Sequence, residues 1–288
     1  MIFRRKIYQN LRDWKDSTSG EKALLIEGAR RIGKSTIVEE FGKNEYRSYL
    51  MIDFNDASDM VFSAFDQYLN DLDTFFMILQ TEYNVVLYPG ESLVIFDEVQ
   101  KFPKARQSIK KLVKDGRYHY IEIGSLISIR DNVKNITLPS EERSLKMYPM
   151  DFEEFCEALG ETMTFEYIRK CFTEKRPLEQ GLHHKAMMLF KQYMLVGGMP
   201  KSVDAYLKNN RSFILVDSEK RDILQLYAND ISKIDGKYKS RVLSIFKQIP
   251  SFLSLHEKRV RLSNIEEKST FPMYQDTFFW LGDSMIVN

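Results

Sequence analysis

The hydrophobic residues of this 288-residue chain follow two different patterns. From residue 22 to about residue 150, short apolar runs alternate with stretches of helical spacing. The apolar runs predict strands, because strands buried on both faces of a parallel sheet are apolar throughout. Strands that alternate with helices predict an α/β fold with a doubly wound, mostly parallel sheet of about five strands. The predicted strands are 23–26, 46–54, 92–96, 118–124 and 144–149.

Helices are predicted between these runs. Asp151 followed by Glu154 is a capping-box pattern, which predicts that a helix begins there. The helices predicted in this part are 7–15, 36–41, 56–69, 72–83, 105–114 and 151–159.

After residue 160 only helical spacing is found, and we expect residues 156–235 to form a helical lid on a core of residues 1–155. Two glycines at 197–198, followed by Pro200, predict a break between two helices. The helices predicted in the lid are 165–172, 182–195, 201–208 and 213–228.

Residues 236–288 form a third, basic part. Residues 237–268 contain eight Lys or Arg and three Glu, a net charge of +5. Helices at 238–249, after Pro250 and at 262–268 fit a winged-helix arrangement, which could bind DNA phosphates. A solvated face of an inter-domain module explains the same charges. The apolar end at 281–288 has no closing element, and we expect that the chain is cut from a longer protein.

Residues 28–36 read GARRIGKST and match the nucleotide-binding pattern G-x-x-x-x-G-K-[ST]. In such a loop, main-chain N–H groups and the next helix N-terminus surround a phosphate. Lys34 would reach the β- and γ-phosphates, and the Ser35 hydroxyl would ligate Mg²⁺. Arg30 and Arg31 could touch phosphate or a neighbouring subunit, or could be exposed without such a role. The predicted nucleotide-binding residues are Gly28, Ala29, Arg30, Arg31, Ile32, Gly33, Lys34, Ser35 and Thr36.

The second candidate motif is the apolar strand 92–96, which runs directly into Asp97 and Glu98. Two carboxylates at the end of a buried strand are costly unless a metal or a water uses them. We expect Asp97 to hold Mg²⁺ through its water shell and Glu98 to act as general base. Ser125 follows the fourth strand at the ligand-binding edge of the sheet, where it is either a sensor of the γ-phosphate or part of an ordinary turn.

The overall composition changes this picture little. The chain has 42 basic and 41 acidic residues, which excludes a globally basic nucleic-acid binder but not a local basic face. No apolar run approaches the roughly 20 residues of a membrane span, and the N-terminus lacks the apolar core of a signal peptide. We therefore expect a cytoplasmic protein that does not contact a membrane.

Five motifs, GARRIGKST, LVIFDEVQ, EIGSLIS, YPMDFEEF and YMLVGGMP, occur in that order. With them, nearly the whole chain resembles the prokaryotic AAA+ ATPases described only as ATP-binding proteins. The resemblance implies ATP as the nucleotide, a P-loop NTPase αβα core, a helical lid and a winged-helix-like segment. Full-length members add a C-terminal domain similar to PD-(D/E)XK nucleases, and this chain ends about where that domain would begin.

The resemblance also implies that Asp97 and Glu98 are the Walker B pair, that Ser125 is the sensor and that Gln100 orients water. The chain departs from the family at two points. Ile123 stands where Thr is usual, and Ser140-Glu141 stands where Gly-Arg is usual, with Arg143 as the nearest arginine. If the family arginine contacts nucleotide, turnover in this chain would be slow.

Together these features predict a Mg²⁺-dependent ATPase that acts as a motor or switch, with Lys34, Glu98 and Ser125 as catalytic residues. A second hypothesis is a binding module for DNA or a protein that needs ATP but does not hydrolyse it. A small-molecule kinase is disfavoured by the adjacent Asp97 and Glu98, because a kinase needs no water-activating base. Residues 7–15 either cover the first strand or pack near the adenine. A homo-oligomer is compatible with either of the first two hypotheses.

Overall fold

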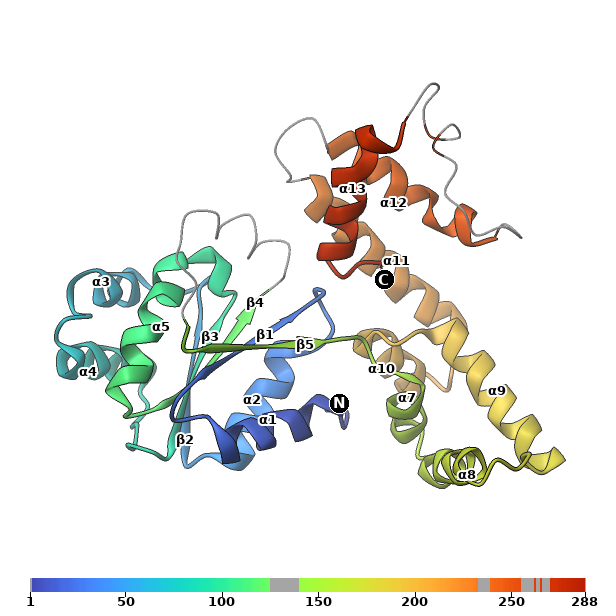
Figure 1. Cartoon of the computed structure of the whole chain (residues 1–288), viewed down its shortest axis with the longest axis horizontal. Helices are drawn as coiled ribbons and strands as arrows, with labels where there is room; N and C mark the ends of the chain where they lie inside the picture. Colours follow the sequence, from blue (N-terminus) through green and yellow to red (C-terminus); the bar gives the residue numbers. More distant parts are fainter. Residues whose placement is uncertain are drawn as a thin grey trace. The chain divides into compact units, whose positions relative to one another are not determined.

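The computed structural model describes residues 2–124, 140–232, 239–254, 262, 265 and 270–287. The chain divides into two compact units, Met1–Asp204 and Ala205–Asn288 (Figure 1). The first unit contains the sheet, and the described part of the second is helical. The division into 1–155, 156–235 and 236–288 stays a prediction.

Five parallel strands form the sheet, in the order β2-β3-β4-β1-β5. This confirms the predicted α/β fold and its five-stranded parallel sheet. The edge strand β5 begins and ends two residues earlier than predicted, because polar residues interrupt its apolar pattern and only Met147 is buried. The strands are β1 Ala23–Gly28, β2 Ser48–Asp53, β3 Ser92–Asp97, β4 His119–Gly124 and β5 Glu142–Met147.

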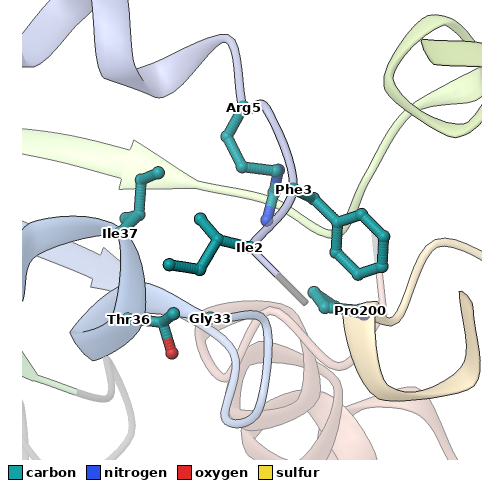
Figure 2. Close-up of a pocket in the computed structure, with 7 residues that line it drawn as sticks. All are labelled: Ile2, Phe3, Arg5, Gly33, Thr36, Ile37 and Pro200. Carbon is teal, nitrogen blue, oxygen red and sulfur yellow. The ribbon is translucent and has the colours of Figure 1, made fainter. Parts of the chain in front are cut away.

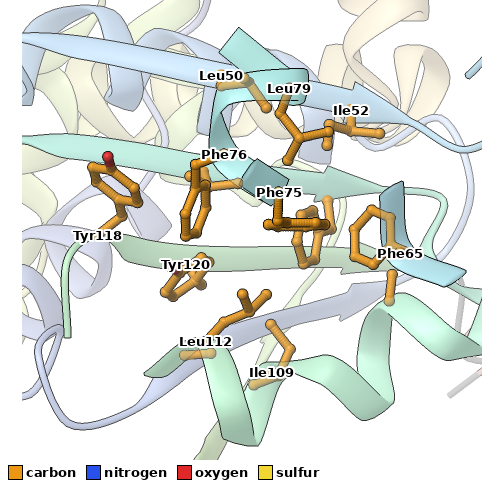
Figure 3. Packing of buried hydrophobic residues seen from close by; sticks show 14 of the residues in the cluster. Leu50, Ile52, Phe65, Phe75, Phe76, Leu79, Ile109, Leu112, Tyr118 and Tyr120 are labelled. Atoms are coloured by element: carbon orange, nitrogen blue, oxygen red, sulfur yellow. The ribbon is translucent and has the colours of Figure 1, made fainter. Parts of the chain in front are cut away.

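One face of the sheet is covered by α3 (Asp59–Gln67), α4 (Leu72–Tyr83) and α5 (Pro103–Asp115). Figure 3 shows the aromatic core on this face, in which Phe65 and Phe75 pack edge to face with ring centres 5.0 Å apart. Both rings are fully buried. This packing fixes β3 from one side and therefore holds the acidic pair at its end.

The opposite face is covered by α2 (Lys34–Glu45), with α1 (Ile7–Ser17) beside it. The indole Nε1 of Trp14 in α1 donates to the carbonyl oxygen of Lys22, at 2.9 Å, one residue before β1 begins. Helix α1 thus covers the start of the first strand, which is one of its two predicted roles.

The part of the first unit that follows β5 is helical. Helix α7 begins with the predicted capping box, in which the Glu154 N–H donates to Asp151 Oδ1 at 2.9 Å and the Asp151 N–H donates to Glu154 Oε2 at 3.1 Å. The helices here are α7 Phe152–Ala158, α8 Thr162–Thr173, α9 Gln180–Val196 and α10 Pro200–Lys208, of which α10 continues into the second unit.

The second unit contains α11 (Phe213–Ser232), α12 (Lys239–Ser254) and α13 (Phe271–Asp283) around a small apolar core. The predicted break at Pro250 is wrong, because α12 continues through this residue to Ser254. Buried side chains before and after it offset the hydrogen bond that proline removes. Helix α13 was not predicted; the expectation for this part of the chain was an apolar end at 281–288. The winged-helix arrangement stays a prediction, and most of the helix expected at 262–268 lies outside the described residues.

Candidate nucleotide-binding site

The glycine-rich loop connects β1 to α2, as its motif requires. Gly28 ends β1, and a Cβ at this position would lie 2.5 Å from the Met147 carbonyl oxygen and 2.7 Å from Ile32 Cδ1. Only glycine therefore fits between β5 and the returning loop. Gly33, with φ +90°, and Arg31, with φ +63°, are left-handed and turn the chain into the helix.

The Lys34 side chain bends back into the loop. Its Nζ donates to the carbonyl oxygens of Gly28, at 3.0 Å, and Ala29, at 2.7 Å. Burial lowers the pKa of Lys34 to about 8, although Glu98 and Asp97 act in the opposite direction. A phosphate bound in the loop would favour the charged form of Lys34, because its negative charge would compensate for the hydration that the buried ammonium lacks.

The carboxylate of Asp97 lies beside the start of α2. Burial raises its pKa, and the nearby Ser35 side chain acts in the opposite direction. The neighbouring strand β2 ends at the same level, where Asp53 is the register partner of Asp97. The two sequence motifs, more than sixty residues apart, therefore meet at one edge of the sheet.

Glu98 leaves the strand in a left-handed conformation, with φ +51°, and its N–H donates to Asp97 Oδ1 at 2.9 Å. Its Oε2 accepts a hydrogen bond from Nε2 of Gln100, which lies in the short helix η1 (Val99–Lys101). Nη2 of Arg30 in the loop lies 3.9 Å from the same oxygen. The candidate base is thus held between Gln100 and the phosphate loop.

A cavity of about 90 Å³ lies next to the loop (Figure 2). One wall is the strap, by which we mean residues 2–6, ahead of α1. The residues that line the cavity are Ile2, Phe3, Arg5, Gly33, Thr36, Ile37 and Pro200. The sequence did not indicate the strap or Pro200 as site residues: the strap belongs to no recognisable motif, and Pro200, at the end of YMLVGGMP, indicated only the break between two helices. The cavity is lined by residues ahead of α1 and by none of α1 itself.

Of the remaining predicted residues, some lie outside the described part of the chain, and the others are either exposed or buried. Ser125 lies outside the described residues, and so does much of the basic segment 237–268. Arg31 and Thr36 are exposed at the loop, and Ala29 and Ile32 are buried beneath it. Arg143 is exposed on the edge strand β5.

Part of the basic segment is engaged within the second unit. Nη1 of Arg241 donates to the carbonyl oxygen of Met273 at 2.9 Å, and its guanidinium lies 5.3 Å from the centre of the Tyr274 ring. This arginine therefore makes a packing contact within the second unit, and DNA binding by the basic segment stays a prediction.

Comparison with known proteins agrees with the geometry of the loop. Residues 20–156 match the family model described as AAA domain, which supports an AAA+ P-loop ATPase family and nucleotide binding for this part of the chain. Residues 187–288 match the model of a domain of unknown function. No curated protein matches the chain.

Among solved structures, the fold is similar to AMPPCP-bound DnaA from Aquifex aeolicus. The sequence identity is 10% and the TM-score is 0.42, over 98% of this chain and 89% of that chain. A likeness at this level does not bear on function. No helix in the described part of the chain is both long and apolar enough to span a membrane.

Proposed function

We propose that the chain binds ATP with Mg²⁺ at residues 28–36 and hydrolyses it, acting as a motor or switch. The observation that carries this proposal is the meeting of the glycine loop with the acidic end of β3, where Nη2 of Arg30 lies 3.9 Å from Glu98 Oε2 and the Ser35 side chain lies near Asp97. The buried ammonium of Lys34 lies next to both. The match to the AAA domain supports the same reading.

The residues present suit both a phosphate and a magnesium ion. Lys34 now bonds to two carbonyl oxygens of its own loop, and a phosphate would replace these weaker partners. Ser35 and Asp97 offer a hydroxyl and a carboxylate, which are the oxygen ligands that Mg²⁺ prefers. When bound, Mg²⁺ would neutralise charge on the β- and γ-phosphates.

Glu98 is the proposed general base. Its carboxylate would accept the proton of a water molecule as that water attacks the γ-phosphorus and ADP leaves. Gln100 and Arg30 contact one carboxylate oxygen, Oε2, so they would orient Glu98 rather than react. Lys34 would stabilise negative charge on the transferred phosphoryl group. We keep Ser125 as the proposed sensor.

The cavity beside the loop would take the adenine. Ile2, Phe3, Ile37 and Pro200 give it an apolar lining, which suits a flat aromatic base. This assignment would make the strap, and not α1, the segment that packs near the nucleotide base.

The test is single-turnover hydrolysis of MgATP. Wild type should hydrolyse ATP, and Glu98→Gln should bind it but react about 10²- to 10⁴-fold more slowly. Glu91→Gln is the matched control, because Glu91 is an exposed surface carboxylate and should not affect the rate. Lys34→Ala should abolish nucleotide binding.

Other results would change the proposal. If wild type and Glu98→Gln both bind MgATP and are equally inactive, the chain is a binding module that does not hydrolyse ATP. If Lys34→Ala binds ATP as tightly as wild type does, the assignment of the loop is wrong.

A further inference from the structure

Arg5, in the strap, is a buried arginine that contacts three distant segments. Its Nη1 donates to the Ile32 carbonyl oxygen in the glycine loop at 2.9 Å. Its Nη2 donates to the Tyr148 carbonyl oxygen, after β5, at 2.6 Å. Its Nε lies 3.2 Å from Oε2 of Glu154 in α7, and both side chains are 6% exposed.

The contact with Ile32 bears directly on phosphate binding. The Ile32 carbonyl and the Gly33 N–H belong to one planar trans peptide, so they point in opposite directions. A donor that holds the carbonyl therefore also sets the direction of the N–H. Gly33 precedes Lys34 at the start of α2, where loop N–H groups bind phosphate.

Stability alone is a weak reason for this arrangement. A buried ion pair usually costs as much in lost hydration as it returns in attraction, and well-packed apolar residues often serve as well. Arg4, next to it in the strap, is largely exposed and only approaches Glu157, at 3.8 Å. The buried guanidinium lies beside the ligand cavity, which it lines together with Gly33 (Figure 2).

We propose that Arg5 is a positioning residue of the phosphate loop. It holds the Ile32–Gly33 peptide so that the Gly33 N–H faces the nucleotide phosphates, and Glu154 holds the guanidinium in place. Glu154 is itself fixed, since its Oε1 accepts the Lys6 N–H at 2.7 Å. This inference rests on the proposed function, and it adds a strap residue outside every recognised motif to the binding of nucleotide phosphates.

The experiment compares the affinities of MgADP and adenosine for wild type, Arg5→Lys, Arg5→Ala, Glu154→Gln and Arg4→Ala. Arg5→Lys keeps the charge but cannot bond to both carbonyls and Glu154 at once. We expect both Arg5 variants to bind MgADP about ten- to a hundredfold more weakly. Adenosine, which carries no phosphate, should lose clearly less affinity than MgADP, although Arg5 also lines the cavity assigned to the adenine. The MgADP affinity of Glu154→Gln should lie between that of the Arg5 variants and that of wild type. Arg4→Ala should bind MgADP as tightly as wild type does.

A purely structural role gives a different result. Arg5→Lys would then lower the Tm of the free protein but bind MgADP as wild type does, and this would overturn the inference while leaving the proposed function intact. Equal weakening of MgADP and adenosine would also overturn it, because the loss would not concern phosphate. If wild type itself does not bind MgADP, the proposed function fails and the inference fails with it. If Arg5→Ala does not fold, Arg5→Lys decides.

Discussion

The backbones of Gly198 and Met150 lie in direct contact. The Met150 N–H donates to the Gly198 carbonyl oxygen at 2.7 Å, and a Cβ on Gly198 would lie only 2.1 Å from the Met150 carbonyl oxygen. The connection between α9 and α10 is thereby held against the connection between β5 and α7. Because no side chain fits between the two backbones, glycine is required at position 198.

Gly198→Ala should therefore destabilise the protein by about 1–3 kcal/mol, because the two connections must separate. Urea denaturation monitored by circular dichroism would measure this change. Gly181→Ala in α9 is the matched control, since a Cβ there meets nothing within 4 Å and should cost nothing. Equal stability of the two variants would show that the contact is dispensable.

Glu122 in β4 should make the stability of the protein depend on pH. It is fully buried, and burial, followed by the neighbouring Glu142, raises its pKa well above 4.5, while Arg106 opposes this. The folded state keeps the proton after the unfolded chain has released it, so stability should fall as pH rises above about 4.5. Arg106 also binds Glu142 through two hydrogen bonds, at 2.8 and 3.1 Å, and Glu27 contributes charge nearby.

Glu122→Gln should remove much of this pH dependence and stabilise the protein at pH 7 by about 1–3 kcal/mol. Denaturation curves between pH 4 and pH 8 would measure it, with exposed Glu82→Gln as the control. If the free energy of unfolding changes with pH equally in Glu122→Gln and in Glu82→Gln, Glu122 is not the group responsible.

Nucleotide binding should take up a proton at alkaline pH. The pKa of Lys34 is lowered to about 8, so above that pH the free protein holds a neutral amine that bound phosphates would protonate. Affinity for MgADP should be flat below pH 8 and should fall above it. Calorimetry at pH 9, in two buffers of different ionisation enthalpy, should report uptake of up to about one proton.

Two comparisons check this assignment to Lys34. The same titrations at pH 7 should show almost no uptake. Lys34→Arg stays charged at both pH values, so any binding that it retains should lack the dependence. Equal proton uptake by wild type at pH 7 and pH 9 would contradict the lowered pKa.

Gln100 should influence the rate of hydrolysis more than the binding of ATP. Its side-chain amide donates to Glu98 Oε2, so Gln100→Ala would release the proposed base from its orientation. We expect kcat to fall about tenfold or more with little change in KM. Gln107→Ala in α5, on the protein surface, is the control. A rise in KM with unchanged kcat would assign Gln100 to ATP binding instead.

The sequence alone determined the parts of the site that lie within short stretches. The glycine loop, the apolar strand that ends in Asp97 and Glu98, and the capping box at Asp151 are recognisable because local backbone geometry demands particular residues at fixed spacing. The alternation of apolar runs and helices was sufficient to predict five parallel strands, since burial on both faces leaves a distinctive pattern. That pattern was weakest at the edge strand β5, where the predicted bounds were two residues late.

Tertiary structure decided the contacts between segments that are distant in sequence. Arg5 and Ile32 are 27 residues apart and Arg5 and Tyr148 are 143 apart, and nothing local distinguishes Arg5 from its exposed neighbour Arg4. The burial of Glu122 and the uninterrupted path of α12 through Pro250 likewise depend on which surfaces pack together. Such contacts form only when the strands and helices assemble, and spacing along the chain does not encode them residue by residue.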